Sequence, residues 1–541
     1  MAPARLVRSA HLSTFAHMGA VYVFHDLYGY LLEMSPDIVE LIDAFAAGAE
    51  VAAVTRRFAG AFGEADPAQF VDVLVAHAVL VEPGDDERAP LWTMVPVKGR
   101  WNVWRRRGDR VTVWTAWGDR PVARIELDAD QTATWDAFDG ERRLAMIAEG
   151  RDRARLLALV ERLTHSDVQA LKLAHLPQSS FAKRPGLTPR YLTSTMPYPR
   201  WQPGEPVPAE PGADGGAVSP QAYYQEAVRD AAAQFDHQET TLSHFLRVPH
   251  PALGGRSYGQ ALVDALAARG AVPAGRVRVL EIGGGLGFVA AAVTGALAAR
   301  GVDVAYTILE LSPALAAAQR ARTAGLPVTV VEGDALAAAP GDGAWDLILA
   351  NEMIGDLPAA RGTHAAPGAA QPWLERLGIV VDDAPDPFYL TTGAFELVER
   401  VARWLAPGGT AVMTEFGDLM GWPRLSSHLD HPELSIHFGQ LAQAARAAGL
   451  EAETVFVIDL LEVDREQRGL ATTRSHFRAL KAMLAEEGVA LEKVGYTPEM
   501  LAALLAGKVG VGEIGDLRWE KIEDRLMGLV PHEFKALLMK R

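Results

Sequence analysis

The sequence predicts an α/β protein in which a Rossmann-like domain with a mostly parallel sheet follows two small α+β units. Three observations predict this arrangement. A glycine-rich turn follows an apolar run in VRVLEIGGGLGF (277–288). Strand-like and helix-like stretches then alternate as far as residue 417, as they do in βαβ units. Before them, the proline-rich stretch 177–220 separates this region from two segments that each contain a hairpin pattern.

The composition describes a globular protein with enough apolar residues for several cores. The chain has 541 residues, of which 49% are hydrophobic and 22% charged. It contains no cysteine, which excludes disulfides, Cys-ligated zinc and thiol nucleophiles. The net charge of −16 disfavours general nucleic-acid binding, and no apolar run is long enough to span a membrane. We therefore expect a cytoplasmic protein with neither nucleic acid nor membrane as a partner.

The first small unit is expected over residues 1–92. VYVFHDLYGYLLEMS (21–35) alternates apolar and polar residues around Tyr28-Gly29, which predicts a β-hairpin. Apolar residues at helical spacing predict three helices after it, over 36–48, 50–63 and 67–83. A hairpin followed by three helices is the outline of a small winged-helix unit.

The second small unit, over 93–176, is expected to be a diverged copy of the first. Two strands are predicted around Gly118-Asp119, followed by a helix and by closing helices within 152–175. The copies align at a constant offset, so that Ile42 to Phe45 match Trp135 to Phe138. Basic residues are concentrated in VKGRWNVWRRRGDR (97–110), which we interpret as a solvated strand edge or turn.

The first unit resembles the PqqD-like recognition elements of ribosomal peptide biosynthesis. The hairpin 21–35, the helix through LIDAF (41–45) and FVDVLVAHAVLVEP (70–83) carry the likeness, which covers about 60 residues. The resemblance implies that the leader of a precursor peptide adds as an extra strand at the hairpin edge, against the last helix. The alternative is a diverged winged helix kept for dimerisation, so a homodimer is also open. The resemblance assigns no peptide to the second copy.

The glycine turn after the linker predicts a site for a nucleotide-like ligand. Gly283, Gly285 and Gly287 separate the expected strand 277–281 from a helix over 288–300. The dinucleotide pattern G-x-G-x-x-G would put Phe288 where a small residue belongs. Glu281, two residues before the first glycine, suits a ligand with cationic groups, such as the amino end of S-adenosylmethionine.

Four further elements follow in the order that class I methyltransferases use, so the domain 221–489 resembles that class. The resemblance implies a seven-stranded, mostly parallel sheet with S-adenosylmethionine as cofactor and S-adenosylhomocysteine as product. It also implies contacts to the cofactor from three places along the chain, namely Glu310 and Leu311 after one strand, Asp334 and Ala335 after the next, and Asn351 at the end of the fourth.

Within that class the chain resembles the MidA-like group, whose mitochondrial members methylate a protein arginine. The likeness spans about 220–480 and is carried by EIGGGLGF, ILELSPALAAAQ, LILANEMIGDLP and HPELSIHFGQLAQAARAAGL. One departure concerns the acceptor side. The group usually has Asp followed by Ala where this chain has Gly355-Asp356, so the carboxylate comes one residue later.

Catalytic candidates lie near the ends of the later strands. Methyl transfer requires that the acceptor be positioned and that one proton be removed, for which carboxylates and histidine are suitable. No metal is expected at His428, His431, Glu433 and His437, because they lack a helical frame of ligands. The tail 490–541 is expected to be a helical extension. The candidates are Glu352, Asp356, Glu415 and His437.

Three functions remain open from the sequence. The first is a methyltransferase that modifies a side chain of a precursor peptide held by its leader, since tethering raises the effective concentration of the acceptor. The second is a MidA-like arginine N-methyltransferase that acts on a folded protein. The third is a regulator that binds S-adenosylmethionine and uses its winged-helix units on DNA, although no basic recognition helix is present to favour it.

Overall fold

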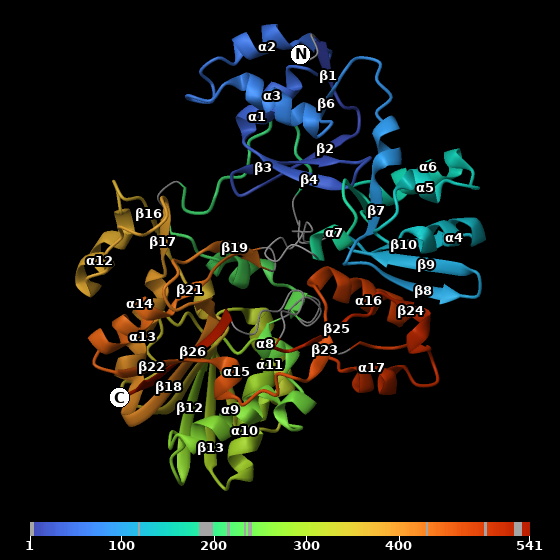
Figure 1. Cartoon of the computed structure of the whole chain (residues 1–541). Helices are drawn as coiled ribbons and strands as arrows, with labels where there is room; N and C mark the ends of the chain where they lie inside the picture. The colour runs from blue at the N-terminus through green and yellow to red at the C-terminus, as the bar shows by residue number, and fades with distance from the viewer. Residues whose placement is uncertain are drawn as a thin grey trace. The chain divides into compact units, whose positions relative to one another are not determined.

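The computed structural model describes residues 5–116, 120–182, 199–213, 217–231, 234–235, 241–428, 431–491, 495–523 and 533–541. The chain divides into two compact units (Figure 1). Unit 1 contains residues 1–210, 475–489 and 507–517, and unit 2 contains 211–474, 490–506 and 518–541. The expected boundary at 489/490 is therefore corrected, because the C-terminal part of the chain contributes to both units.

The first part of unit 1 contains the predicted hairpin followed by helices. Strand β3 (Ala20–His25) pairs antiparallel with β4 (Tyr30–Met34), and β3 pairs on its other side with β2 (Leu12–His17). The helices are α1 (Pro36–Asp43), α2 (Val51–Arg57) and α3 (Pro67–Ala76), each shorter than expected. Three short strands complete this part, namely β1 (Arg5–Arg8), β5 (Ala49–Glu50) and β6 (Leu80–Val81). The winged-helix assignment remains a prediction.

Part of the expected linker packs against unit 1. Phe15 of β2 forms an antiparallel bridge with Arg200, and Trp201 N–H donates to the carbonyl of Thr14 at 2.9 Å. The Trp201 side chain is 7% exposed and belongs to the apolar core of this part of unit 1. Residues 199–201 thus cover the outer edge of β2, while 183–198 lie outside the described residues.

The second part of unit 1 repeats the hairpin and the helix that follows it. Ile125 and Leu127 of β10 are buried, as are Trp135 and Phe138 at the end of α4. The expected helices of 152–175 are corrected at their end, because 171–174 form a strand that pairs with β7. The expected turn at Gly118-Asp119 falls outside the described residues. The elements are η1 (Ala89–Thr93), β7 (Val95–Lys98), β8 (Val103–Arg107), β9 (Arg110–Thr115), β10 (Ala123–Leu127), α4 (Ala129–Ala137), α5 (Leu144–Ile147), α6 (Arg153–Thr164), β11 (Leu171–Ala174) and α7 (Ser179–Ala182).

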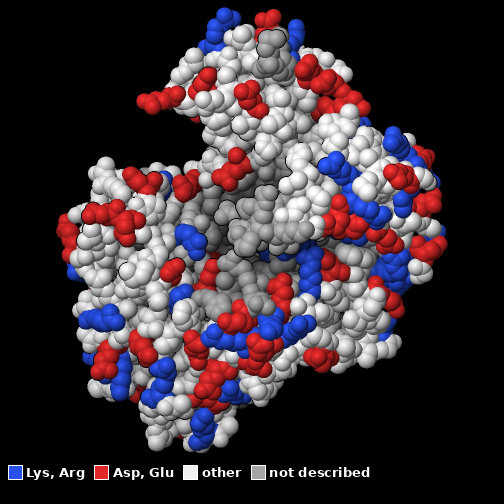
Figure 2. All heavy atoms as spheres, viewed as in Figure 1, with Lys and Arg blue, Asp and Glu red and all other residues white. Residues whose placement is uncertain are grey.

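C-terminal residues complete this second part. Strand β24 (Ile514–Gly515) pairs with β8, and α16 (Arg474–Glu486) ends next to Glu487. Arg105 of the basic run is buried and forms ion pairs with Glu487 and, at 3.1 Å, with Glu513. The arginines of β8 in the basic run, Arg105, Arg106 and Arg107, are therefore bound by acidic residues of unit 1. On the face drawn in Figure 2, the described basic and acidic side chains lie interspersed.

Unit 2 is built on the expected Rossmann-like sheet. Its strands lie in the order β14-β13-β12-β15-β18-β26-β22, with β21 beside β18. Neighbours from β14 to β18 run parallel, whereas β26 runs antiparallel to both β18 and β22. The strands are β12 (Arg276–Ile282), β13 (Asp303–Glu310), β14 (Val328–Glu332), β15 (Trp345–Asn351), β18 (Leu405–Asp418), β21 (Ile436–His437), β22 (Glu451–Phe456) and β26 (Phe534–Lys540).

The C-terminal strand corrects the expectation of a helical extension over 490–541. Among the described residues of that range, α17 (Pro498–Leu505) is the only α-helix. The range also contains one short 3-10 helix, η7 (Val511–Glu513). Strand β26 lies inside the sheet, where Leu537 and Met539 are buried. The remaining strands of this range are β24 and β25 (Trp519–Lys521), the latter paired with β23 (Arg468–Leu470). The last residues of the chain are thus part of the core of unit 2.

Helices cover both faces of this sheet (Figure 1). Chain order runs from β12 outward to β13 and β14, then returns to β15 on the other side of β12. Because parallel crossovers are right-handed, this reversal puts the helices of the two halves on opposite faces. One set is α9 (Tyr258–Ala268), α10 (Phe288–Ala299) and α11 (Pro313–Arg322), and the other is α13 (Thr392–Trp404) and α14 (Phe438–Ala447). The strand order reverses between β12 and β15, where open α/β sheets bind ligands.

Shorter elements of unit 2 surround the carboxyl ends of these strands. They are η2 (Tyr223–Ala227), α8 (Leu242–Phe245), η4 (Pro251–Leu253), η5 (Ile354–Asp356), β16 (Ala360–Gly362), η6 (Gly368–Ala370), α12 (Gln371–Leu377), β17 (Phe388–Leu390), β19 (Leu425–His428), β20 (His431–Leu434) and α15 (Val457–Leu460). Across the described part of the chain, no helix is long and apolar enough to cross a membrane.

Candidate active site

A cavity of about 1270 Å³, part of it open to solvent, lies within unit 2 at the carboxyl ends of β12, β13 and β15. Ten of the residues expected to form the site line it, namely Glu281, Gly283, Gly285, Glu310, Leu311, Asp334, Ala335, Asn351, Glu352 and Asp356. The cavity therefore coincides with the point where the strand order reverses.

The glycine turn needs glycine at each expected position. Gly283, Gly285 and Gly287 have φ of 68°, 50° and 79°, a region that side-chain-bearing residues rarely adopt. A Cβ at Gly284 would approach Ile308 Cγ2 to 2.7 Å. At Gly285, a Cβ would meet no atom within 4 Å, and this residue lines the cavity. The turn thus leaves space for a ligand against its backbone at Gly285.

Glu281 ends β12 with its side chain 1% exposed. The Tyr306 hydroxyl donates to its Oε2 at 2.9 Å. The pKa of Glu281 is raised to about 8, mainly by burial and also by the Glu310 carboxylate, and the Tyr306 hydrogen bond opposes this rise. A cationic group in the cavity would stabilise the ionised form of Glu281.

Glu310 ends β13 and is held in one orientation. Its Oε1 accepts from the N–H of Ser312 at 2.9 Å, and its Oε2 accepts from Gln319 Nε2 at 2.6 Å. Gln319 Nε2 also donates to the carbonyl of Gly285 at 2.9 Å, so it links the glycine turn to this carboxylate. Burial raises the pKa of Glu310, and these hydrogen bonds oppose the rise. Hydroxyl donors of a ligand would favour the ionised carboxylate.

The segment after β14 forms another wall. Asp334 Oδ1 accepts from the N–H of Leu336 at 2.8 Å, and its Oδ2 accepts from Gln221 Nε2 at 3.2 Å. Ala335 is 7% exposed and lines the cavity beside it. The small side chain at 335 leaves room for a flat group, and Asp334 adds an acceptor at its edge.

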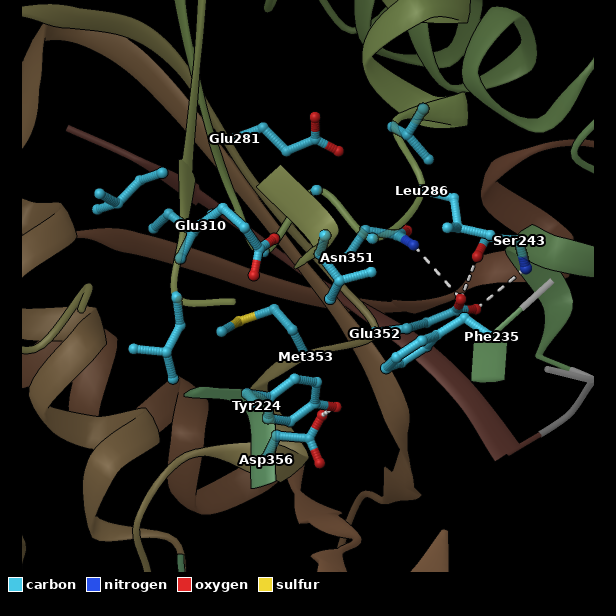
Figure 3. A pocket seen from close by; sticks show the side chains of 18 of the residues that line it. Tyr224, Phe235, Ser243, Glu281, Leu286, Glu310, Asn351, Glu352, Met353 and Asp356 are labelled. Carbon is cyan, nitrogen blue, oxygen red and sulfur yellow. Dashed lines mark hydrogen bonds between the residues drawn. The ribbon is translucent and has the colours of Figure 1, made fainter. Parts of the chain in front are cut away.

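Glu352 follows β15 and adopts φ of 52°, which is unusual for a residue with a side chain. Its N–H donates to the carbonyl of Thr414 at 2.9 Å. Its carboxylate accepts from the Ser243 N–H at 3.1 Å and from the Ser243 hydroxyl (Figure 3). Asn351 is fixed in turn, because its Oδ1 accepts from Tyr258 at 2.7 Å and from Thr414 at 2.9 Å. The strained backbone at Glu352 thus holds a carboxylate in a defined place.

Asp356 lies in η5 with two partners. The Tyr224 hydroxyl donates to its Oδ2 at 2.6 Å (Figure 3), and His431 Nε2 lies 3.0 Å from its Oδ1. The ring of Tyr223 stacks on His431 with centroids 4.5 Å apart. Glycine is required at 355, because a Cβ there would lie 2.6 Å from the carbonyl oxygen of Leu434. This contact explains why the carboxylate of this loop comes from residue 356.

Glu415 lies behind the cavity wall and is 1% exposed. Its oxygens accept from the N–H groups of Gly355 at 3.1 Å and Phe416 at 3.0 Å. Burial raises its pKa well above the usual range, and the carboxylates of Glu433 and Asp356 raise it further. Glu433 itself lines the cavity, so three carboxyl groups gather at this end of the site.

Besides Glu415, two further expected site residues do not line the cavity. Gly287 is the N-cap of α10, where an added Cβ would lie 3.3 Å from the Cα of Gln319. His437 is the N-cap of α14 and accepts from the Gln440 N–H through Nδ1 at 3.2 Å. Burial lowers the pKa of His437, and its position makes it a helix cap. A polar residue directly before the helical pattern FGQLAQAARA is the signal that predicts this role.

Several residues that are not predicted from the sequence also shape the cavity. Tyr224 contacts Asp356, Ser243 contacts Glu352, and His244 and Arg247 contribute a basic wall. All four precede β12 in the chain, where no motif with known spacing marks them. No group of three or more metal-ligating side chains is present among the residues that the structure describes.

No model of a known protein family matches the chain, and no curated protein matches it. Similar solved structures include an uncharacterised protein from Burkholderia thailandensis, which is 17% identical with a TM-score of 0.34. The match covers 61% of this chain and 89% of the Burkholderia chain. A second protein from that organism, solved with S-adenosyl-homocysteine bound, is 18% identical over 61% of this chain and 89% of its own, with a TM-score of 0.31. An S-adenosylmethionine dependent methyltransferase from Mesorhizobium loti is 16% identical over 52% of this chain and 100% of its own, with a TM-score of 0.26. These likenesses are too weak to carry an argument about this chain.

Proposed function

We propose that this protein is an S-adenosylmethionine-dependent methyltransferase that modifies a side chain of a precursor peptide recognised through its leader. The observation that carries the methyltransferase part is the cavity between β12 and β15, where the glycine turn and the Glu310 carboxylate meet. A nucleoside fits beside Glu310, because an acidic residue at the end of the second strand accepts both ribose hydroxyls.

The residues of the cavity fit this cofactor along its length. Gly285 provides backbone without a side chain, Glu310 provides oxygens for the ribose, and Ala335 with Asp334 borders the adenine. Glu281 provides a carboxylate for a cationic group. When bound, the cofactor supplies a methyl group activated by a sulfonium.

The other end of the cavity suits a nucleophile that must lose a proton. Glu352 and Asp356 both line the cavity, and each is oriented by hydrogen bonds. Methyl transfer is an in-line displacement, so the main task of these side chains is to position the acceptor. We assign Asp356 the role of proton acceptor, because it lines the cavity and is held there by Tyr224 and His431.

The leader is proposed to bind at the outer edge of β4. In the described part of the chain β3 lies between β2 and β4, and residues 199–201 cover the β2 side. No described strand pairs with the outer edge of β4. The Tyr30 hydroxyl donates to the carbonyl of His77, so β4 begins beside the end of α3, whose Val73 side chain is 55% exposed. An extended peptide gains backbone hydrogen bonds at such an edge and side-chain contacts with the helix.

A second candidate is arginine N-methylation of a folded protein. The observation that favours it is the pair of cavity-lining carboxyls, Asp356 and Glu433, which can hold a guanidinium through paired hydrogen bonds. In that case the first part of unit 1 serves docking or dimerisation.

Mass spectrometry of candidate substrates distinguishes the two. The full-length protein is incubated with S-adenosylmethionine and each precursor peptide encoded beside its gene, with Glu310→Ala as the inactive control. Gain of one methyl group on the core of a precursor, slowed about 100-fold or more when the leader is removed, supports the proposal. A methyl mark on arginine of a folded protein, with the precursors unmodified, supports the second candidate.

A further inference from the structure

A basic cluster lies in the cavity beside the glycine turn. His244 lies in α8, and Arg247 lies two residues after the end of that helix. Both side chains line the cavity and are largely buried, with exposed fractions of 8% and 7%. Both lie against Phe288, the first residue of α10. The Arg247 guanidinium carbon lies 4.4 Å from the centroid of its ring, and the His244 ring meets it edge-on at 6.4 Å.

Contacts within this cluster orient the guanidinium. Arg247 Nη1 lies 2.7 Å from His244 Nε2, to which it donates a hydrogen bond. This leaves the histidine proton on Nδ1, because the Nε2 lone pair accepts. The aromatic face of Phe288 stabilises the cation on its other side. Arg247 thus contacts His244 and Phe288, and it also borders the cavity.

Charge is distributed unevenly around this part of the cavity. The N-terminus of α10 (Phe288–Ala299), with its positive end of the helix dipole, lies on the same side as Arg247. Glu281, at the end of β12, contributes a negative charge when ionised. A ligand group that carries both a carboxylate and an ammonium matches this distribution, and a free α-amino acid end is such a group.

We propose that Arg247, oriented by His244, binds the carboxylate at the amino-acid end of the cofactor. This inference rests on the proposed function, since it assigns one end of the S-adenosylmethionine site. The planar guanidinium can form two parallel hydrogen bonds to a carboxylate, which an ammonium cannot. Recognition of that carboxylate selects S-adenosylmethionine and S-adenosylhomocysteine over nucleosides that lack the amino-acid end.

Calorimetric binding to the full-length protein tests this assignment with two probes. S-Adenosylhomocysteine carries the amino-acid end, and methylthioadenosine has the same nucleoside and thioether without it. Arg247→Ala is expected to weaken S-adenosylhomocysteine binding by about 10- to 100-fold, the usual loss for a hydrogen-bonded charged group. Methylthioadenosine binding is expected to change less than about 3-fold, within ordinary context effects.

Arg322→Ala is the matched control. Arg322 also stacks on Phe288, at 3.6 Å, but it donates to the carbonyl of Leu286 and does not line the cavity. Its loss is expected to leave the ratio of the two affinities unchanged. Arg247→Lys keeps the charge but loses the paired hydrogen-bond donors of the guanidinium. It should therefore retain only part of the preference for S-adenosylhomocysteine over methylthioadenosine. His244→Asn should reduce the preference less than Arg247→Ala does, because it removes the orienting contact alone.

The outcomes separate this inference from the proposed function. If Arg247→Ala weakens both probes equally, or neither, while the wild type binds both, the assignment of Arg247 is wrong and the cofactor site stands. If the wild type binds neither probe, the proposed cofactor site itself is wrong. Circular dichroism and thermal unfolding of each variant establish that it is folded before its affinities are compared.

Discussion

Ser243 donates both its backbone N–H and its hydroxyl to the carboxylate of Glu352, a residue held at a positive φ of 52°. One short helix, α8, therefore fixes a carboxylate that lies at the end of β15. The same stretch of chain contributes His244 and Arg247 to the cavity. The residues that orient the acceptor end and those that border the glycine turn are thus close in sequence, and a change in one should affect the other.

The backbone strain at Glu352 predicts a difference between two substitutions that both remove its carboxylate. Glu352→Gly should be more stable than Glu352→Ala by about 1 kcal/mol, because glycine adopts a positive φ without a steric penalty. Chemical unfolding of the two variants measures this difference. Equal stability, or a more stable alanine variant, would show that the left-handed conformation does not persist in solution.

Removal of the Ser243 hydroxyl alone should lower the stability of the folded protein. Ser243→Ala removes one donor to a carboxylate and leaves the backbone donor, which should cost about 1.5–3 kcal/mol. The loss should be largely absent when the same substitution is made in Glu352→Ala, since the two groups act as a pair. Additive losses in the double variant would contradict the coupling.

The raised pKa of Glu281 leads us to predict that the affinity for the cofactor rises with pH. In the free protein its pKa is raised to about 8, so most of the population is protonated at pH 7. A bound ammonium stabilises the carboxylate and lowers that pKa, so binding releases a proton below about pH 8. The association constant should therefore increase from pH 6 to 8, by at most about tenfold per unit, and then level off.

Calorimetry with S-adenosylhomocysteine in buffers of different ionisation enthalpy measures this proton release. Glu281→Gln is the control, because it keeps the shape and removes the titration. Its affinity should be nearly independent of pH over the same range. An unchanged slope in Glu281→Gln would assign the proton to another group.

The C-terminal strand predicts that residues near the end of the chain are needed for the core. Leu537 of β26 is fully buried between β18 and β22, so Leu537→Ala should cost about 2–5 kcal/mol. Lys540→Ala, at the exposed end of the same strand, should stay within about 0.5 kcal/mol of the wild type. Differential scanning calorimetry compares the two. Similar small effects would contradict the position of β26 inside the sheet.

The buried position of Trp201 leads us to predict that this part of the expected linker stabilises unit 1. Its side chain is 7% exposed in the core of that unit, so Trp201→Ala should cost about 3–5 kcal/mol. Gln202→Ala, at an exposed neighbouring position, is the matched control. Cofactor affinity should not change in either variant, because the cofactor site is built from residues of unit 2. Equal thermal stability of both variants would show that residues 199–201 do not pack as described.

Much of unit 2 could be predicted from local patterns. The expected strand 277–281 and helix 288–300 correspond to β12 and α10, since a buried apolar run, a glycine turn and an alanine-rich stretch are all local signals. Strand β26 could not be predicted in this way. FKALLMK consists largely of good helix formers, and only its two antiparallel neighbours make it a strand.

The same limit applies to the site. The resemblance to class I methyltransferases predicts Glu310, at the end of β13, and Asp334, after β14, as site residues, because the carboxyl ends of parallel strands meet at one edge. The residue type of His437 makes it a catalytic candidate in the sequence, whereas its position directly before a helix makes it a cap. Ser243 and Arg247 depend on a short helix whose position is set by tertiary packing, so no spacing in the sequence identifies them.

The most direct test of the central claim is calorimetric titration of the full-length protein with S-adenosylhomocysteine and, separately, with NAD. We predict one S-adenosylhomocysteine bound per chain, loss of that binding in Glu310→Ala, and no measurable binding of NAD. Binding of NAD with none of S-adenosylhomocysteine to the folded protein would contradict the account and assign the cavity to dinucleotide chemistry.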